Sequence, residues 1–389
     1  WELRRTVQEL FNGVQYTEAL HYEPFFPSTS ANYIRSRNSS GAVGIVGEII
    51  QQLGLFQPDV DLVGTKVVRS KVRSQIASTY GDSGVAEQAR LDHEKEVGKL
   101  HVGEAIEYDD GLLKSKWVMV MDEVKRRAIN EPALVQAVGL AEALKIRVIS
   151  KGPPLLYTFL SPLQKFMWST LKDNRVFKLI SEPITADHVA ERIGIPRDDE
   201  IIVNGDYKAS TDNLHSWVSE CIGREIVNCI RLAHVPGEGY EFDADHEEMF
   251  IRSLIHHQYE IDGIWMPQLE GQLMGSVTSF PVLCIANAAM CRWSLEVANN
   301  RRYRLSDRPY RGCGIIAPLL VNGDDCTLKG NRSCLRAIWE RITSFGGLST
   351  SVGKTLFSLV EKPICVLNST TYHWIDGHWE HVKFVNMGT

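Results

Sequence analysis

The sequence predicts a fold of mixed helices and strands, and three observations support this. Helical patterns dominate from about residue 70 to residue 143, whereas short apolar strands alternate with amphipathic helices in the second half. Apolar strands over 315–321 and 326–328 flank an Asn-Gly-Asp-Asp turn, which is typical of a β-hairpin. The chain has 389 residues, of which 44% are hydrophobic, so we expect more than one core-bearing subdomain.

The composition argues against several classes of protein. The eight cysteines form no Cys-x-x-Cys pair, so we expect reduced thiols rather than a zinc site or a disulfide scaffold. No apolar run approaches the roughly 20 residues that span a bilayer. A net charge of −6 argues against a protein that simply coats nucleic acid, but it permits an enzyme with a local basic channel. Because the sequence opens on Trp1 and ends in a strand-like run, we expect a fragment or a processed piece.

Other helices and strands are indicated by hydrophobic periodicity and by capping residues. They are a helix over 162–171, a strand over 200–204, a helix capped by Ser210 or Thr211, a helix with Pro281 in its first turn, and a helix capped by Asn331 or Ser333 and ended by Gly346-Gly347. A turn-rich stretch over 27–44 is expected to be a loop.

The basic residues cluster in three places. The clusters are Lys66, Arg69, Lys71 and Arg73; Lys114, Lys116, Lys125, Arg126 and Arg127; and Lys145, Arg147 and Lys151. Solvated helix faces are the simpler interpretation of the first two. The third lies on a predicted strand over 145–151, and three cations there would suit a triphosphate. The alternative is an amphipathic strand with an exposed polar edge.

The hairpin turn carries the first candidate chemistry, in Gly323, Asp324 and Asp325. A tight turn whose acids simply face water is the plain alternative. A second acid pair weakens it, because Asp206 closes a predicted strand and Asp212 follows six residues later. If the two strands lie side by side, Asp206 and Asp324 would face each other and could bridge two hard cations. Mg²⁺ suits such oxygen ligands. For Asp212 the alternative role is that of an acid at the start of a helix, where it would complement the helix dipole.

Two further features complete the set. The loop over 271–281 is bracketed by Gly271 and Gly275, and it runs into a helix for which Thr278 or Ser279 could be merely the N-cap. Lys354 follows the Gly-Gly turn, where most lysines are simply solvated.

The order of these motifs carries a resemblance. A basic strand, Asp-x5-Asp, a glycine-serine loop, a Gly-Asp-Asp hairpin and a lysine together resemble the palm signature of RNA-dependent RNA polymerases. The Met-Gly-x-x-x-Ser of 274–279 and the Lys-x-Arg-Val-Ile-x-Lys-Gly of 145–152 look like the narna-like and ourmia-like lineage of plus-strand RNA viruses. The segments 27–30 and 384–388 are also similar, and the resemblance is clearest over 145–354.

The resemblance implies a role for each matching residue. Asp206 and Asp324 would bind two Mg²⁺ ions, or Mn²⁺, with Asp325 in support and the Tyr207 carbonyl as a further ligand. The remaining roles are Asp212 and Ser279 at the ribose, Lys145, Arg147 and Lys151 on the nucleotide path, Gly275 and Thr278 in the template-facing loop, and Lys354 as proton donor to pyrophosphate. Many relatives place a sugar-sensing Asn where this chain has Leu283, so Asn287 is expected in that role only as a substitute.

The resemblance also implies an α+β right-hand polymerase with a palm sheet that is antiparallel and flanked by helices, and a largely missing thumb. We expect fingers over 1–195 with the basic strand as fingertip, palm over 196–238, an insertion over 239–270, palm over 271–380, and the start of a thumb over 381–389. RNA template and product and nucleoside triphosphates would be the partners. Host cytoplasm is the expected location, with the mitochondrion as the lesser alternative.

Two rival functions stay open at the level of sequence. A reverse transcriptase shares the palm and the metals, but it would exclude the ribose 2′-OH with a bulky aromatic side chain near the first acid. This chain has Asp212 there instead, which favours ribonucleotides. An inactive RNA-binding homologue is the second rival. Intact Asp206, Asp324 and Asp325 argue against it, because burying such acids together without cations would be costly.

Overall fold

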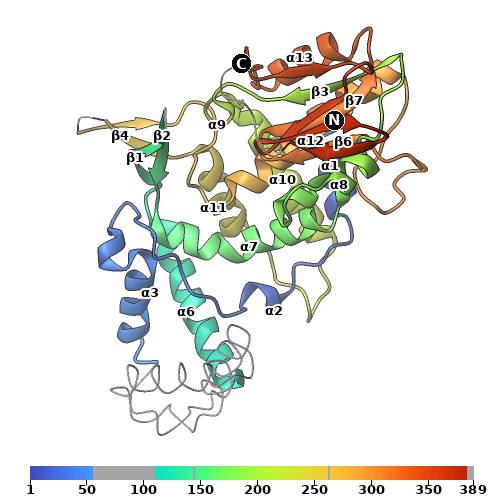
Figure 1. Cartoon of the computed structure of the whole chain (residues 1–389). Helices are drawn as coiled ribbons and strands as arrows, with labels where there is room; N and C mark the ends of the chain where they lie inside the picture. Colours follow the sequence, from blue (N-terminus) through green and yellow to red (C-terminus); the bar gives the residue numbers. More distant parts are fainter. Residues whose placement is uncertain (56–109, 143–144, 262, 383–389) are drawn as a thin grey trace, which may run out of the picture.

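The computed structural model describes residues 1–55, 110–142, 145–261 and 263–382 (Figure 1). The described strands form three sheets, in the orders β6-β7-β3-β8, β2-β1-β4-β5 and β11-β10-β9. The strands are β1 (Leu134–Glu142), β2 (Lys145–Lys151), β3 (Glu200–Gly205), β4 (Gln258–Ile261), β5 (Ile264–Pro267), β6 (Leu319–Asn322), β7 (Asp325–Asn331), β8 (Leu356–Ser358), β9 (Ile364–Leu367), β10 (Thr370–Ile375) and β11 (His378–His381).

The helices are α1 (Glu2–Phe11), α2 (Glu18–His21), α3 (Gly41–Gln52), α6 (Asp110–Asn130), α7 (Pro154–Lys172), α8 (Ala186–Arg192), α9 (Ser210–Asn213), α10 (Ser216–Leu232), α11 (Ala244–Ile255), α12 (Ser279–Asn299) and α13 (Leu335–Phe345), with 3-10 turns η1 (Arg37–Ser39) and η2 (Arg175–Ile180). In the described part of the chain, none of them combines the length and the hydropathy that crossing a membrane requires. Figure 1 shows α12 beside β6 and β7, whereas α3 and α6 lie away from the three sheets.

The sheet β6-β7-β3-β8 is antiparallel throughout and is covered on both faces. Its side chains alternate between two cores, as the period of a strand requires. Val203 belongs to the larger core, with α12 and α13, whereas Ile202 belongs to a smaller core with strands β9 to β11. Strand β3 and helix α13 pack tightly at Gly205, because a Cβ there would meet the Trp339 ring of α13 at 2.5 Å. The sheet is therefore packed between two cores, and the expected division into subdomains stays a prediction.

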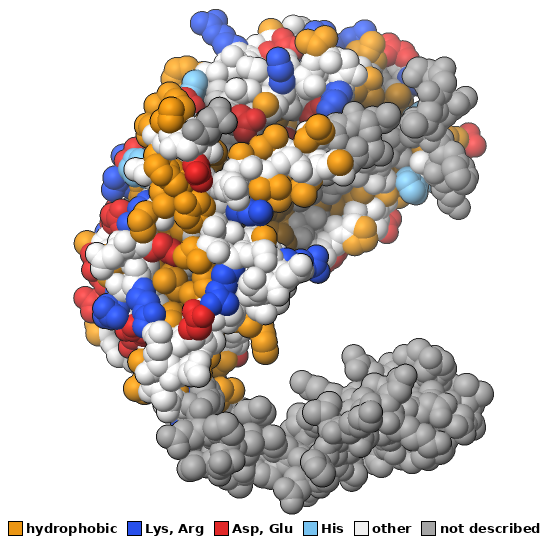
Figure 2. All heavy atoms as spheres, turned by 90° about the vertical axis from the view of Figure 1, so that its left-hand side faces the viewer, with side chains coloured by type: hydrophobic (Ala, Val, Ile, Leu, Met, Phe, Trp, Pro, Cys, Tyr) orange, Lys and Arg blue, Asp and Glu red, His pale blue; other side chains and the backbone are white. Residues whose placement is uncertain are grey.

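The sheet β2-β1-β4-β5 is covered far less. Ile146, Val148, Ile264 and Trp265 are exposed on it. Figure 1 shows β1, β2 and β4 projecting from the body of the molecule, away from the other two sheets. Viewed from that side, hydrophobic side chains lie among Lys and Arg side chains on the surface (Figure 2).

Several sequence-based expectations for the elements are wrong. Residues 134–142 form strand β1 rather than helix, because they pair with β2 from Gln136–Lys151 to Glu142–Lys145, and this ladder outweighs local propensity. Helix α7 begins at Pro154 instead of near Pro162, since Pro154 fits the first helical position and Pro162 is accommodated inside the helix. The first strand of the hairpin begins at residue 319, not 315.

The expected helix caps are also wrong. Ala209, not Ser210 or Thr211, is the N-cap of α9, and the expected single helix is divided into α9 and α10. Cys334 is the N-cap of α13, while the Asn331 side chain instead accepts the Ser333 N–H at 2.9 Å. In both places the expected capping side chain is engaged by another group. Ser210 bonds to Asp324, far away in the sequence, and Asn331 bonds to the backbone of Ser333, two residues on.

Other expectations agree with the structure. Strands β2 and β3, the hairpin, and the stop of α13 at Gly346-Gly347 lie where the sequence places them. All eight cysteines are free. The basic residues at 66–73 and the segment 384–388 lie outside the described residues, as does most of the predicted thumb start.

Candidate active site

One cavity of about 830 Å³ collects most of the predicted site residues. Its wall comes from the end of β3, helix α9, the loop before α12, the hairpin turn, strand β2 and Lys354. The predicted residues on it are Arg147, Asp206, Tyr207, Asp212, Gly275, Ser279, Asp324, Asp325 and Lys354. Arg147 and Lys354, which lie 207 positions apart in the sequence, therefore meet in one place, as the motif order predicts.

Asp206 follows β3, which pairs with β7 and so lies beside the hairpin strand. Its backbone is fixed by a neighbouring loop, because the Asp206 carbonyl accepts from the Ser351 N–H at 2.8 Å and from the Thr355 hydroxyl at 2.9 Å. Its carboxylate stays accessible, with 26% of the side chain exposed, and Lys354 Nζ lies 3.5 Å from Oδ2. Lys354 is itself 72% exposed, so this contact is a screened one that a substrate could replace.

Asp324 lies in the two-residue turn of the hairpin, which Gly323 enters with a φ of +66°. Ser210 donates its hydroxyl hydrogen to Asp324 Oδ2 at 2.5 Å. The left-handed Ala209, at φ +46°, precedes Ser210 in this segment. Sequence reasoning considered Ser210 only as a helix cap, and its position between Asp206 and Asp212 was the signal that pointed to the site.

Asp325, like the other two acids, is half-buried. Burial raises its pKa to about 6, and the negative charges of Asp324 and Asp206 contribute to the rise, against the Asn368 N–H and Lys354. The Asn368 N–H donates to Asp325 Oδ2 at 3.2 Å. Asp324 and Asp206 are therefore near enough to disfavour the charge on Asp325, which is the chemistry of a site that accepts cations.

The acids do not form a ready-made metal cage. Among the described residues, no group of three His, Cys, Asp or Glu side chains is arranged around a common point. Instead, the Asp324 carboxylate accepts a hydrogen bond from Ser210, and the Asp206 carboxylate lies beside the Lys354 ammonium group. Because Mg²⁺ keeps several waters and shares its shell with substrate phosphates, one or two carboxylates from the protein are enough for it. The donor set therefore fits a hard divalent cation bound together with substrate.

The loop before α12 joins the acid-bearing sheet to the basic strand. The Ser150 N–H of β2 donates to the Met274 carbonyl at 2.9 Å. At Gly275, with φ +132°, a Cβ would meet the Ser150 carbonyl oxygen at 2.3 Å, so only glycine fits. Gly271 packs equally tightly, since a Cβ there would meet the Thr211 carbonyl oxygen at 2.5 Å.

Two residues of this loop were expected to cap the helix or to face the template. Thr278 occupies the N-cap position, but its side chain makes no cap hydrogen bond. It is fully buried and pairs with the Ser253 hydroxyl at 2.8 Å, which argues against contact with a template. Ser279 lines the cavity, and its hydroxyl donates to Gln272 Oε1 at 3.1 Å.

The basic strand reaches the cavity through Arg147, which is exposed there. Lys151 is half-buried and lies outside the described wall of the cavity. The backbone of Lys145 pairs with Glu142, whereas its side chain lies outside the described residues. Of the described side chains of the triplet, that of Arg147 is thus the one that the structure brings to the cavity of the acids.

Asn287 lies beneath the hairpin turn rather than on the cavity wall. Its side chain is fully buried, and its amide is engaged on both sides by protein groups. This placement argues against the expected contact between Asn287 and a ribose. Tyr207 is likewise buried, with its ring against Trp339, so that its backbone alone faces the acids.

Asn368 was missed by sequence reasoning. It adopts φ +51° beside Ser369 at +58°, which are the angles of a type I′ hairpin turn. Besides its bond to Asp325, its side-chain oxygen accepts from the Asn322 amide at 2.7 Å. An Asn-Ser pair between two strands of alternating polarity was the available signal.

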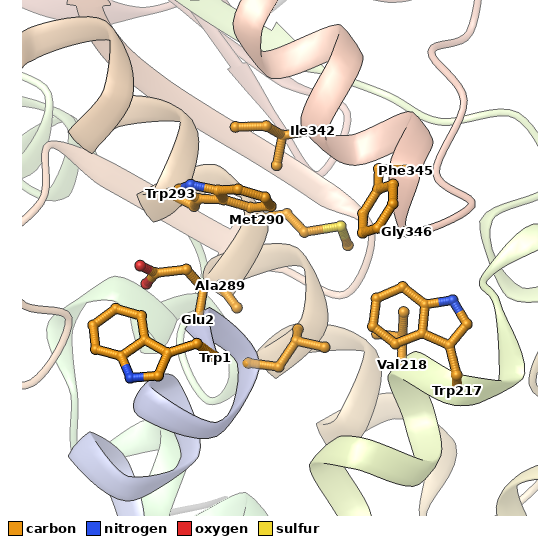
Figure 3. A pocket seen from close by; sticks show the side chains of 11 residues that line it. Trp1, Glu2, Trp217, Val218, Ala289, Met290, Trp293, Ile342, Phe345 and Gly346 are labelled. Atoms are coloured by element: carbon orange, nitrogen blue, oxygen red, sulfur yellow. The ribbon is translucent and has the colours of Figure 1, made fainter.

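A second pocket lies elsewhere on α12 and has a different character (Figure 3). It measures about 520 Å³ and is enclosed by α1, α10, α12 and α13. Trp1, Trp217, Trp293, Met290 and Phe345 lie around it. Glu2 is the one charged residue on its described wall, so it does not suit a triphosphate.

The comparison with curated proteins agrees with the motifs. The chain is 30% identical over 279 residues to the RNA-dependent RNA polymerase of Ourmia melon virus, a match that covers 69% of this chain and 31% of the relative. This chain is a homologue of that polymerase. The resemblance to ourmia-like polymerases is therefore confirmed, although the chain spans less than a third of its relative. No family model matches the sequence.

Solved structures of viral polymerases are similar in outline. The RNA-dependent RNA polymerase of a human picobirnavirus, in a form that lacks an insertion loop, matches with a TM-score of 0.49 and 11% identity. That match covers 86% of this chain and 65% of the picobirnavirus chain. The same polymerase without the deletion gives a TM-score of 0.47, with 12% identity over 86% of this chain and 63% of the other.

Proposed function

We propose that this chain carries the reaction centre for template-directed RNA synthesis in viral replication. The observation that carries the proposal is the cavity in which Asp206, Asp324 and Asp325 meet Arg147 and the loop before α12. Homology to an RNA-dependent RNA polymerase, in a match that covers 31% of that relative, supports the activity. In the reaction, the 3′-OH of an RNA strand attacks the α-phosphate of a nucleoside triphosphate and pyrophosphate leaves.

Asp206 and Asp324 would hold two Mg²⁺ ions, with Asp325 and the Tyr207 carbonyl in support; Mn²⁺ would suit the same oxygen ligands. When bound, such ions activate the attacking hydroxyl and stabilise the charge on the leaving oxygen. Ser210 would keep Asp324 aligned, and the loop at Ser351 and Thr355 would keep Asp206 in place. The elevated pKa of Asp325 supports this assignment, because burial and the charges of Asp324 and Asp206 raise it and a bound cation would offset the part that comes from those charges.

The substrate would lie along the other walls. Arg147 would bind the triphosphate, since its guanidinium matches phosphate oxygens, and Lys145 and Lys151 would add positive charge nearby. Asp212, exposed on α9, would accept a hydrogen bond from the ribose 2′-OH, with Ser279 beside it. Lys354 would donate a proton to the departing pyrophosphate.

In this proposal the chain is the palm and fingers of a right-hand polymerase. The sheet β6-β7-β3-β8 with α12 and α13 would be the palm. The sheet β2-β1-β4-β5, with β2 as fingertip, would belong to the fingers, together with most residues before 195. Residues 239–270 would be an insertion between the two palm segments.

Primer extension on an RNA template tests the proposal. With Mg²⁺ and ribonucleotides the chain should extend the primer, and it should do so poorly with deoxyribonucleotides. EDTA should stop extension, and added Mg²⁺ should restore it. Efficient use of deoxyribonucleotides on the same template would make it a reverse transcriptase, and RNA binding without extension under any condition would make it an inactive homologue.

A further inference from the structure

The amide of Asn287 holds the turn that carries Asp324. Asn287 comes from the middle of α12 and is fully buried. Its Nδ2 donates to two successive carbonyls of the turn, that of Gly323 at 3.1 Å and that of Asp324 at 2.9 Å. Both donor hydrogens of the amide are therefore used on the two residues that fix the backbone of the acid turn.

The other side of the same amide is tied to the first acid. Tyr207, the residue after Asp206, donates its hydroxyl hydrogen to Asn287 Oδ1 at 2.9 Å. The Tyr207 ring is buried against Trp339 of α13, so its hydroxyl has little freedom to leave this contact. One amide thus spans the two chain segments whose carboxylates face the cavity.

The orientation of the amide follows from its neighbours. Its nitrogen faces two carbonyl oxygens, so an exchanged amide would oppose oxygen to oxygen twice. The Cys291 thiol also donates to Oδ1, at 3.2 Å. Four groups therefore specify a single orientation of Asn287, and no water is required to complete its hydrogen bonds.

Helix α12 is itself anchored, so the amide has a fixed base. Arg292, fully buried five residues beyond Asn287, pairs with Glu9 of α1 at 2.5 Å and donates to the Thr6 hydroxyl at 2.6 Å. Cys284, one turn before it, accepts the Gly323 N–H at 3.2 Å. The turn is therefore bonded to α12 at its N–H and at its carbonyls.

We propose that Asn287 and Tyr207 are positioning residues that set the separation of the Asp206 and Asp324 carboxylates. Neither side chain reaches the cavity with a polar atom; they act through the backbone of the two acids. The inference rests on the proposed function, and it deepens it by assigning how the acid pair is held ready for a divalent cation. Residues that orient metal ligands cost about 10–100-fold in cation affinity or activity when removed.

The test compares Asn287→Ala and Tyr207→Phe with the wild type in two measurements. In the first, Mg²⁺ alone is titrated while the melting temperature is followed, and half of the Mg²⁺-induced rise should require about 10–100-fold more Mg²⁺ in Asn287→Ala. In the second, kcat for primer extension should fall by a similar factor while KM for the nucleotide changes little. Tyr207→Phe removes only the hydroxyl and should give a smaller loss of the same kind.

The losses caused by Asn287→Ala and Tyr207→Phe should not be independent of each other. Because both break one bridge, the double variant should lose little more than Asn287→Ala alone, whereas independent losses would multiply. Ser294→Ala is the matched control, since Ser294 is also fully buried on α12 but bonds only within the helix, to Met290 at 2.7 Å. It should lower the melting temperature without changing the Mg²⁺ midpoint.

Two outcomes would overturn the inference. One is a Mg²⁺ midpoint and a kcat in Asn287→Ala that match those of Ser294→Ala, which would make Asn287 a structural residue only. The other is losses that multiply in the double variant. If the wild type does not extend RNA at all, the proposed function fails, and the Mg²⁺ titration still decides whether the bridge positions the acids.

Discussion

The two four-stranded sheets differ in how completely they are buried. The sheet β6-β7-β3-β8 has a core on each face, and Asp206 and Asp324 follow the ends of its strands β3 and β6. The sheet β2-β1-β4-β5 leaves Ile146, Val148 and Trp265 exposed and presents Arg147. Regions with few buried contacts open at lower free energy than the core. Asp206 and Asp324 are therefore held by a well-buried sheet, whereas the Arg147 side chain that faces the same cavity belongs to a sheet that is expected to open more easily.

The loop before α12 is where the two sheets are joined. It bonds to β2 through Ser150 and Met274, and it packs on α9 through Gly271. Changes on the acid side should abolish chemistry, changes at the joint should misplace the basic strand, and changes on the basic strand should weaken substrate binding. The following variants separate these three effects.

The largest effect is expected at the acid turn. Asp324→Asn is isosteric, so the fold and the melting temperature should persist, but nearly all nucleotidyl transfer should be lost because the cation contributes several kcal/mol to the transition state. Turnover in primer extension is the measurement. Asp245→Asn, an exposed acid on α11, is the control and should behave like the wild type. Comparable turnover in Asp324→Asn and Asp245→Asn would remove Asp324 from the site.

A substitution at the joint should have the next largest effect. In Gly275→Ala the new Cβ would meet the Ser150 carbonyl oxygen at 2.3 Å, so the loop and β2 must separate. KM for nucleotide should rise and kcat should fall together.

Gly377→Ala separates this clash from simple backbone strain. Gly377 also has a positive φ, of +87°, but nothing lies within 4 Å of its Cβ position. It should cost about 1–3 kcal/mol of stability and leave KM unchanged. Equal kinetic losses in the two variants would mean that the joint does not matter.

The sugar preference should respond to Asp212→Ala, with a smaller effect. Removing the acceptor of the ribose 2′-OH should narrow the ratio of kcat/KM for ribonucleotides over deoxyribonucleotides, since an unpaired hydrogen-bonding group costs about 1–3 kcal/mol. Most of the change should come from a slower ribonucleotide. In Asn287→Ala this ratio should stay constant even as kcat falls, because Asn287 lies beneath the turn. An unchanged ratio in Asp212→Ala would return Asp212 to the role of a helix-start acid.

The smallest effect is expected on the basic strand. Arg147→Ala should raise KM for nucleotide, and the difference from wild type should shrink with added salt because exposed charges are screened. Lys172→Ala, an exposed cation at the end of α7, should leave KM unchanged at every salt concentration. A salt-independent rise in Arg147→Ala would point to lost packing rather than lost charge.

The sequence predicted the elements whose signals are local. The apolar strand before Asp206, the Gly-Asp-Asp hairpin and strand β2 all carry a period or a turn that their own residues specify. Strand β1 was missed because its identity comes from pairing with β2, and Ser210 was taken for a cap because its partner, Asp324, is 114 residues away.

For the site, too, local motifs could be predicted from the sequence, whereas contacts between distant segments could not. Motif order predicted which acids meet, because Asp206 follows β3 and Asp324 follows β6, which are strands of one sheet. The supporting bonds from Asn368, Thr355 and Asn287 could not be predicted, because each depends on a contact between segments distant in sequence. Thr278 and Asn287 were expected at the substrate, and only burial distinguishes a residue beneath the site from one that lines it.

Anomalous diffraction from crystals soaked in Mn²⁺ with a nucleoside triphosphate tests the central claim most directly. Mn²⁺ takes the same oxygen ligands as Mg²⁺, so the anomalous peaks report where the cations bind. The account predicts peaks bound by both Asp206 and Asp324, roughly 3.5–4 Å apart if two ions are present. Peaks elsewhere, or carboxylates of Asp206 and Asp324 held more than about 10 Å apart, would contradict it.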